Sequence, residues 1–261
     1  MSSIFQVNAF THGRFSGNPA AVVLLREQAE PVWMQKLAQQ MNLSETAFVT
    51  VPAKGTEVFD LCWFTPETEV DLCGHATLAS ASVLWSEGVV PDGQTIRFQT
   101  RSGVLLARNF ENEIVLTFPT DPIQSIDDFP GLEDALGCAP IFVGKGKDDL
   151  VVVVDSAETV RGLQPDFVRL AALPIRGVAV SAVSDTPEYD FISRFFAPAV
   201  GIDEDPATGS VHCALVDYWS KHLQKDSLVA FQASARGARL SLHELNNAIE
   251  IGGKAGLGFQ R

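Results

Sequence analysis

The chain has 261 residues, of which 19 are Lys or Arg and 32 are Asp or Glu, so its formal net charge is −13 and its isoelectric point is near 4.7. This surplus of negative charge repels nucleic-acid phosphates and anionic membrane surfaces, and we expect neither as a partner. A small acidic substrate is not excluded, because helix ends and a few arginines can outweigh a distant net field.

The hydrophobic content of 46% predicts a globular chain, large enough for one big domain or two of ordinary size. The N-terminal segment has no basic start and no long apolar stretch, unlike a signal peptide, and the apolar run Ala20–Leu25 is too short to span a bilayer. The four cysteines lack CxxC or Cys/His ligand spacing. We therefore expect reduced thiols in a cytoplasmic protein, with no disulfide framework and no metal site.

The first half of the chain alternates strand and helix patterns. Pro31 opens a helix on which Trp33, Leu37 and Met41 fall four apart, which predicts one buried stripe. Glu67–Asp71 is an expected acidic loop, after which a helix of small residues runs over Gly74–Trp85. Strands are expected at Ile4–Phe10, Ala20–Leu25, the end of Asn42–Val49, Val58–Phe64, Thr95–Thr100, Val104–Arg108 and Ile114–Phe118.

The second half centres on the stretch from Phe191 to Leu215. Phe191–Ala197 is predicted to be a buried strand, followed by the acidic run Asp203–Asp205 and a helix that Thr208-Gly209-Ser210 opens. Backbone N–H groups in the first turn of a helix have no intrahelical partner and suit a carboxylate or an enolate-like oxygen. The alternative is an acidic loop that merely caps an ordinary core helix.

The two halves share four landmarks in the same order. One is the Phe-Gln pair Phe98-Gln99, which returns at Phe231-Gln232 with an offset of 231 − 98 = 133. The others pair Phe64-Thr-Pro66 with Phe196-Ala-Pro198, Gly74–Trp85 with Ala207–Tyr218, and Pro31 with Pro165. This repetition predicts two homologous lobes, residues 1–119 and 120–261, with terminal strands free to cross between them.

Two related lobes predict two equivalent helix starts that face each other across a cleft. An anionic substrate in such a cleft would meet two positive helix ends, each worth roughly 0.3–1 kcal/mol when exposed. This arrangement can bind a carboxylate and acidify the neighbouring carbon. The alternative is a duplication that now serves only stability.

The groups that can move protons break the symmetry. Glu45 precedes a strand and has no acidic counterpart in Pro174–Ala179; apolar neighbours would raise its pKa and suit it as a general base. His75 stands one residue into its helix, where the dipole would lower the pKa of the imidazole. Asp205 can orient His75, or an amine or hydroxyl of the substrate. The alternative interpretation is that neither residue has a catalytic role, Glu45 being a solvated residue at a strand edge and His75 a histidine of the core.

Other motifs are weak. Gly144-Lys-Gly-Lys147 is half of a phosphate loop and more typical of a turn before the strand Leu150–Val154. Thr208–His212 contains Ser and His but lacks the GxSxG elbow, and neighbours on one helix cannot form a triad, which argues against a hydrolase.

Four motifs in order resemble the PhzF family, the phenazine-biosynthesis isomerase-like proteins related in fold to diaminopimelate epimerase. They are Asn8-Ala-Phe with Gly17-Asn-Pro-Ala-Ala-Val22, Leu43-Ser-Glu-Thr-Ala-Phe48, Cys73-Gly-His-Ala-Thr77 and Glu204-Asp-Pro-Ala-Thr-Gly-Ser210. The resemblance implies an α+β fold of two pseudo-symmetric lobes, each an antiparallel barrel-like sheet wrapped around a central helix. It also implies an active site between the lobes and a homodimer.

The resemblance assigns roles to eight residues. The catalytic set is Glu45 as the proton-transferring base with His75 and Asp205, and the substrate-binding set is Asn18, Cys73, Gly74, Gly209 and Ser210. Related epimerases and proline racemases use a Cys in each lobe. We expect Cys73 to be the first of these and Pro206 to hold the second place, with Cys213 too far along the helix to substitute.

We therefore predict a cofactor-independent isomerase that moves a proton on a small carboxylate-bearing substrate through the single base Glu45. One alternative is an amino-acid epimerase or racemase that uses Cys73 with Glu45. The other is a binding protein that kept the lobes but lost the reaction. The sequence does not specify the substrate.

Overall fold

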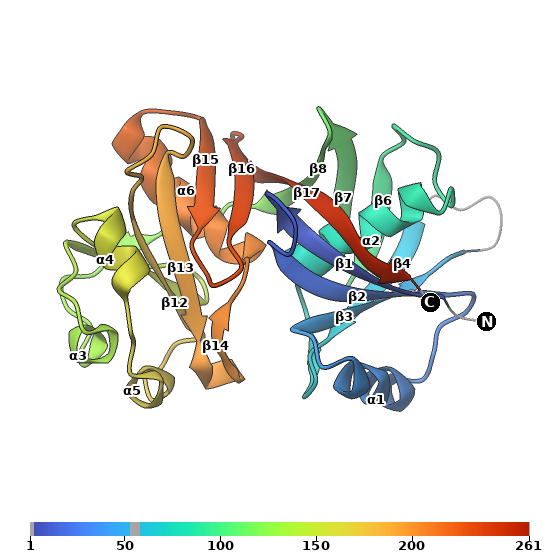
Figure 1. Cartoon of the computed structure of the whole chain (residues 1–261), viewed down its shortest axis with the longest axis horizontal. Coiled ribbons are helices and arrows are strands. Elements are labelled where there is room, and N and C mark those ends of the chain that lie inside the picture. Colours follow the sequence, from blue (N-terminus) through green and yellow to red (C-terminus); the bar gives the residue numbers. More distant parts are fainter. Residues whose placement is uncertain (1–2, 53–57, 261) are drawn as a thin grey trace. The chain divides into compact units, whose positions relative to one another are not determined.

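The computed structural model describes residues 3–52 and 58–260 (Figure 1). The chain divides into two compact units, Met1–Phe118 with Ile251–Arg261, and Pro119–Glu250. Most of the last strand therefore belongs to the first unit. The predicted division placed residues 251–261 in the second lobe but allowed that terminal strands could cross between the lobes.

The first unit is a closed barrel of eight strands. Backbone pairing runs in a ring from β1 through β2, β3, β4, β6, β7, β8 and β17 and back to β1. These eight strands are β1 (Ser3–Thr11), β2 (Asn18–Leu25), β3 (Glu45–Thr50), β4 (Val58–Phe64), β6 (Ile96–Thr100), β7 (Gly103–Phe110), β8 (Glu113–Pro119) and β17 (Ala248–Gln260). The short strand β5 (Glu69–Val70) pairs with β4 outside the ring, and the helices of the unit are α1 (Pro31–Met41) and α2 (Gly74–Ser86).

Helix α2 is the centre of this unit. Ten of its thirteen residues are buried, and it packs against β1, β2 and β3. A helix that is apolar all round can be stable only when other elements cover every side. Its small residues, such as Ala76 and Ala79, let the strands approach closely. The start of α2 is thereby fixed against the strands that carry the candidate site.

The second unit repeats this plan around α6 (Gly209–Leu223), which packs against β11, β15 and β16. Its strands are β9 (Gln124–Ser125), β10 (Phe142–Lys145), β11 (Asp149–Val153), β12 (Gly177–Val183), β13 (Phe191–Ala197), β14 (Ile202–Asp205), β15 (Ser227–Gln232) and β16 (Ala238–Glu244). Its shorter helices are α3 (Leu132–Leu136), α4 (Ala157–Gly162), α5 (Phe167–Ala171) and the 3-10 turn η1 (Pro198–Val200).

Strand register confirms the duplication. In the parallel pair β4–β6, Phe59 lies opposite Phe98, and in the parallel pair β13–β15, Ile192 lies opposite Phe231. The offsets are 192 − 59 = 133 and 231 − 98 = 133, the value that the sequence landmarks gave. The predicted α+β class with two similar lobes is thus confirmed. Most pairings are antiparallel, but each unit also has two parallel pairs, β2–β3 and β4–β6 in the first and β11–β12 and β13–β15 in the second.

Two local predictions were wrong. The buried residues of α1 are Met34 and Ala38, whereas Trp33 is 44% exposed, because the core of β2, β3 and β4 meets the helix one residue later than the predicted stripe. The two acidic runs are not simply loops. Each contains a short strand, Glu69–Val70 against β4 and Ile202–Asp205 against β13, so backbone pairing holds the acids in place.

Gly177 occupies the place of Glu45 in the second unit. Glu45 begins β3 and lies opposite Ala20 of the parallel neighbour β2; Gly177 begins β12 and lies opposite Asp149 of the parallel neighbour β11. A Cβ atom at Gly177 would come within 2.4 Å of Phe195 Cζ and 2.9 Å of the Phe196 carbonyl oxygen. No side chain fits there, so Glu45 has no acidic counterpart, as the sequence indicated.

We predict that Gly177→Ala destabilises the protein by about 1–3 kcal/mol, because the ring of Phe195 and the backbone of β13 must both move. Gly162→Ala is the matched control, since a Cβ there meets no atom within 4 Å. Urea unfolding of both variants measures the effect. Equal free energies of unfolding for the two variants would show that the position tolerates a side chain.

Candidate active site

An acid and an imidazole meet at the start of α2. Glu45 is the first residue of β3 and His75 is the second residue of α2; His75 Nε2 lies 3.2 Å from Glu45 Oε2. The two side chains are only 13% and 5% exposed. The predicted strand-edge Glu is therefore not a solvated surface residue, and it lies beside the predicted His.

Asn18 and Cys73 contact the other nitrogen of the ring. Asn18 Nδ2 lies 3.3 Å and Cys73 Sγ 3.5 Å from His75 Nδ1. Because the amide nitrogen of Asn is a donor, Nδ1 acts as the acceptor and the proton of the neutral ring belongs on Nε2. Nε2 is the nitrogen nearer Glu45, 3.2 Å from Oε2.

The first turn of α2 leaves room for a ligand beside His75. Its N-cap residue Cys73 is extended, and the Thr77 hydroxyl donates to the Cys73 carbonyl at 2.6 Å. Gly74 follows without a side chain that could cover the unpaired backbone N–H groups of the turn. The structure thus gathers five predicted site residues in the first unit: Asn18, Glu45, Cys73, Gly74 and His75.

Burial lowers the pKa of His75 from 6.5 to about 3. The direction agrees with the sequence prediction, but the cause is loss of water around the ring rather than the helix dipole. His75 is therefore neutral at physiological pH. A neutral imidazole can donate one hydrogen bond and accept another, and it does not hold Glu45 as a simple ion pair.

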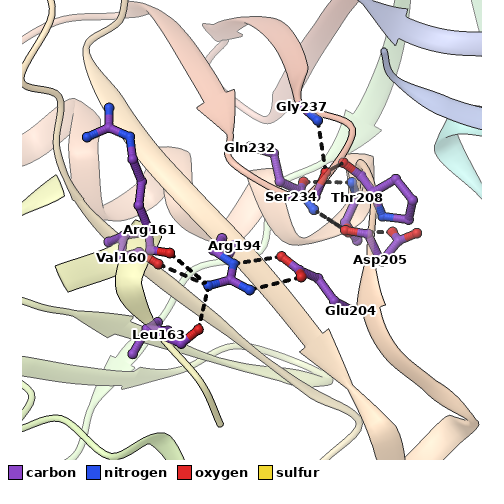
Figure 2. Close-up of polar contacts among 11 residues, drawn as sticks. Val160, Arg161, Leu163, Arg194, Glu204, Asp205, Thr208, Gln232, Ser234 and Gly237 are labelled. Carbon is purple, nitrogen blue, oxygen red and sulfur yellow. Dashed lines mark hydrogen bonds and ion pairs between the residues drawn. The ribbon is translucent and has the colours of Figure 1, made fainter. Parts of the chain in front are cut away.

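Asp205 ends β14 in the second unit and is 7% exposed. It accepts a 2.5 Å hydrogen bond from the Thr208 hydroxyl, while the buried Gln232 donates to the Asp205 carbonyl at 2.8 Å and accepts from the Thr208 backbone N–H at 2.8 Å. Figure 2 shows the Gln232 side chain beside both residues, with its hydrogen bonds to them. Gln232 was not among the predicted site residues, although the repeated Phe-Gln landmark marked its position.

Arg194 anchors the strand that carries Asp205 (Figure 2). Its guanidinium donates to both carboxylate oxygens of Glu204, at 2.7 and 2.9 Å, and to the carbonyls of Val160, Arg161 and Leu163 at the end of α4. It also lies over the ring of Phe196, 4.9 Å from the centroid. The bidentate ion pair between Arg194 and Glu204 thus attaches the acidic run to the neighbouring strand β13.

Gly209 and Ser210 open α6, as predicted. The Ser210 hydroxyl accepts from Arg176 at 3.3 Å, and Arg176 in turn forms a fork with the buried Asp149, with Nε 2.9 Å from Oδ1. Arg176 was not among the predicted site residues. A cation–acid pair at the start of α6 therefore contrasts with the acid–imidazole pair at the start of α2.

The predicted match of Cys73 with Pro206 stays a prediction, and the strand-register offset agrees with it, since 73 + 133 = 206. Counted from the helix starts instead, the N-cap residue Cys73 corresponds to Thr208, which pairs His75 with Ser210. Neither Pro206 nor Thr208 carries a thiol. The expectation that Asp205 orients His75 concerns both units and stays a prediction.

Comparison with known proteins places the chain in a family. A family model described as phenazine biosynthesis-like protein (PhzC-PhzF) matches residues 7–261. The chain belongs to this phenazine biosynthesis-like family. A relative from Halalkalibacterium halodurans, named an uncharacterised isomerase, is 44% identical over 97% of this chain and 94% of its own length. The chain is accordingly an isomerase of the phenazine biosynthesis-like family.

Solved structures agree. A phenazine biosynthesis protein of the PhzF family from Enterococcus faecalis superposes with a TM-score of 0.93 at 41% identity, covering 100% of this chain and 98% of that one. A hydroxyproline epimerase from Agrobacterium vitis shares the fold at a TM-score of 0.64 and 10% identity, over 100% and 91% of the two chains. Within residues 3–52 and 58–260, no helix combines the length and apolar character needed to cross a membrane.

Arg194→Met should cost about 3 kcal/mol of stability, because it leaves Glu204 buried without its cation. The two side chains are 11% and 20% exposed. Arg161→Met is the control: Arg161 forms a similar fork with Asp185, but these side chains are 43% and 53% exposed, so the loss should stay below about 1 kcal/mol. Urea unfolding measures both, and equal losses would contradict the assigned role of burial.

His75 makes stability depend on pH. Below pH 6.5 the unfolded chain binds a proton at His75, whereas the native chain binds it only near pH 3, because burial lowers the pKa. The free energy of unfolding should therefore decrease as the pH is lowered from about 6.5 to about 3. His75→Gln should reduce the slope by up to about 1.4 kcal/mol per pH unit. Urea unfolding between pH 7 and 4 tests this, and identical slopes in wild type and His75→Gln would contradict it.

Proposed function

We propose that this isomerase moves a proton on a small carboxylate-bearing substrate, with Glu45 as its single base and without a cofactor. Glu45 removes a proton from a carbon beside a carboxylate or enamine and delivers it to another atom of the same substrate. The observation that carries the proposal is the 3.2 Å approach of Glu45 Oε2 to His75 Nε2 at the start of α2.

The surroundings of Glu45 support a role as base. A carboxylate that is largely removed from water, beside a neutral imidazole that can donate a proton, can both accept and return a proton. A base held in this way typically contributes roughly 10²–10⁴-fold to the rate. The unpaired N–H groups at the start of α2 would stabilise negative charge that develops on the substrate carboxylate, next to Gly74.

An epimerase that uses Cys73 with Glu45 is the second candidate. The position of Cys73 Sγ, 3.5 Å from His75 Nδ1, favours it, because an imidazole beside a thiol can take its proton. A reaction with two thiols is disfavoured, because neither Pro206, at the offset of 133, nor the N-cap residue Thr208 of α6 carries a thiol. Loss of stereochemistry at a deuterated α-carbon would identify the epimerase. A catalytically silent binding protein would show neither exchange nor turnover.

We also propose that the working form is a cytoplasmic homodimer and that Asp205, Gly209 and Ser210 of the second unit have roles of their own, Asp205 in catalysis and the other two in substrate binding. The buried hydrogen bonds among Asp205, Thr208 and Gln232 support this part, because they hold a carboxylate in one place beside the start of a helix.

Glu45→Gln should abolish turnover and retain ligand binding, because the amide keeps the shape of the side chain but cannot accept the proton. The assay screens small cyclic and acyclic amino acids and related carboxylates for deuterium uptake from D₂O by NMR. The expected loss of exchange is at least about 10²-fold.

Glu27→Gln is the matched control, since Glu27 is an exposed glutamate of the same unit. It should exchange at the wild-type rate. Near-full exchange by Glu45→Gln would remove Glu45 from the mechanism, whereas loss of exchange in both variants would point to damage unrelated to the proposed base.

A further inference from the structure

Three metal-binding side chains meet at the start of α2. Glu45, Cys73 and His75 each offer one ligand atom, and these atoms all lie within 4.8 Å of one another. Cys73 and His75 are 6% and 4% exposed, and they are two residues apart on one turn. Sequence spacing gave no sign of this set, because the third member, Glu45, comes from β3, 28 residues before Cys73 (73 − 45 = 28).

The donor set is one that Zn²⁺ prefers. Thiolate, imidazole and carboxylate are its three usual protein ligands, at about 2.0–2.3 Å, and three protein ligands with one open position describe a site that keeps a water or another ligand. Hard ions such as Mg²⁺ and Ca²⁺ take oxygen ligands instead and would not be held by a thiol and an imidazole.

We propose that Glu45, Cys73 and His75 bind a Zn²⁺ ion that inhibits the isomerase. On binding, the Cys73 S–H bond breaks, its proton passes to water, and the sulfur electron pair forms the bond to zinc. No electron transfer is involved. His75 binds through Nε2, the nitrogen nearer Glu45, and its ring proton moves to Nδ1; Glu45 supplies one carboxylate oxygen.

Zinc binding requires side-chain rotation, because Cys73 Sγ lies beside Nδ1 and Glu45 Oε2 beside Nε2 of the same ring. The backbone can stay in place, since Cys73 and His75 lie on the first turn of a buried helix and Glu45 starts a paired strand. Asn18 lies beside Nδ1, and once its amide turns over, its side-chain oxygen can accept the Nδ1 proton and orient the ligand from outside.

Zinc would block the chemistry because it occupies the carboxylate oxygen that takes the proton. This consequence for activity rests on the proposed function, but the binding itself does not. A spectroscopic assay can therefore succeed or fail whatever the reaction turns out to be.

The test uses Co²⁺ as a coloured substitute for Zn²⁺. Chelator-treated protein is titrated with Co²⁺, and a thiolate-to-cobalt charge-transfer band should grow to one equivalent and vanish when Zn²⁺ is added. Cys73→Ser should lose the band, and both Glu45→Gln and His75→Gln should bind Zn²⁺ at least about tenfold more weakly in competition with a chromophoric chelator.

Cys138→Ser is the matched control, because Cys138 is a half-buried thiol of the second unit outside the cluster. It should keep the band and the affinity. Zn²⁺ should also protect Cys73 of the unmodified protein from alkylation, which tests the site without a variant. A band that survives in Cys73→Ser, or alkylation of Cys73 that Zn²⁺ does not slow, would overturn the proposal.

Discussion

The enclosure of α2 by the strands of its own barrel is the constraint on which the candidate site depends. Because the helix is buried on nearly every side, its first turn cannot shift relative to β2 and β3. His75 is therefore held against Glu45, and water is excluded from both. The same burial that stabilises the unit gives the imidazole its lowered pKa and keeps it neutral. Burial of α2 therefore both stabilises the first unit and sets the protonation state of His75.

The two units share one arrangement of strands around a central helix, and substitutions at equivalent positions make their polar groups different. Equivalent strand starts carry Glu45 in one unit and Gly177 in the other, where the ring of Phe195 fills the space of a side chain. Counted from the helix starts, His75 corresponds to Ser210. The second unit instead presents a cation, Arg176, at its helix start. These differences support the proposal of a single base, as does the lack of a thiol at both Pro206 and Thr208.

Much of this was readable from the sequence. Periodicity and turn residues located Val58–Phe64 and Phe191–Ala197 to the residue, and repeated landmarks gave the offset that the strand register later showed. What the sequence could not give was the set of contacts made between distant segments. The ion pair of Arg194 with Glu204, the hydrogen bonds of the buried Gln232 and the approach of Glu45 to His75 all depend on tertiary structure. The local pattern of apolar residues indicates which face of a helix or strand is buried, but it does not indicate which distant residues contact that face.

The most direct test of the acid–imidazole pair is a long-range ¹H–¹⁵N NMR measurement of the His75 ring at neutral pH. The contacts of Nδ1 with Asn18 and Cys73 predict a neutral ring with its proton on Nε2, the nitrogen 3.2 Å from Glu45. A neutral ring protonated at Nδ1, or a fully charged imidazolium at pH 7, would contradict the account.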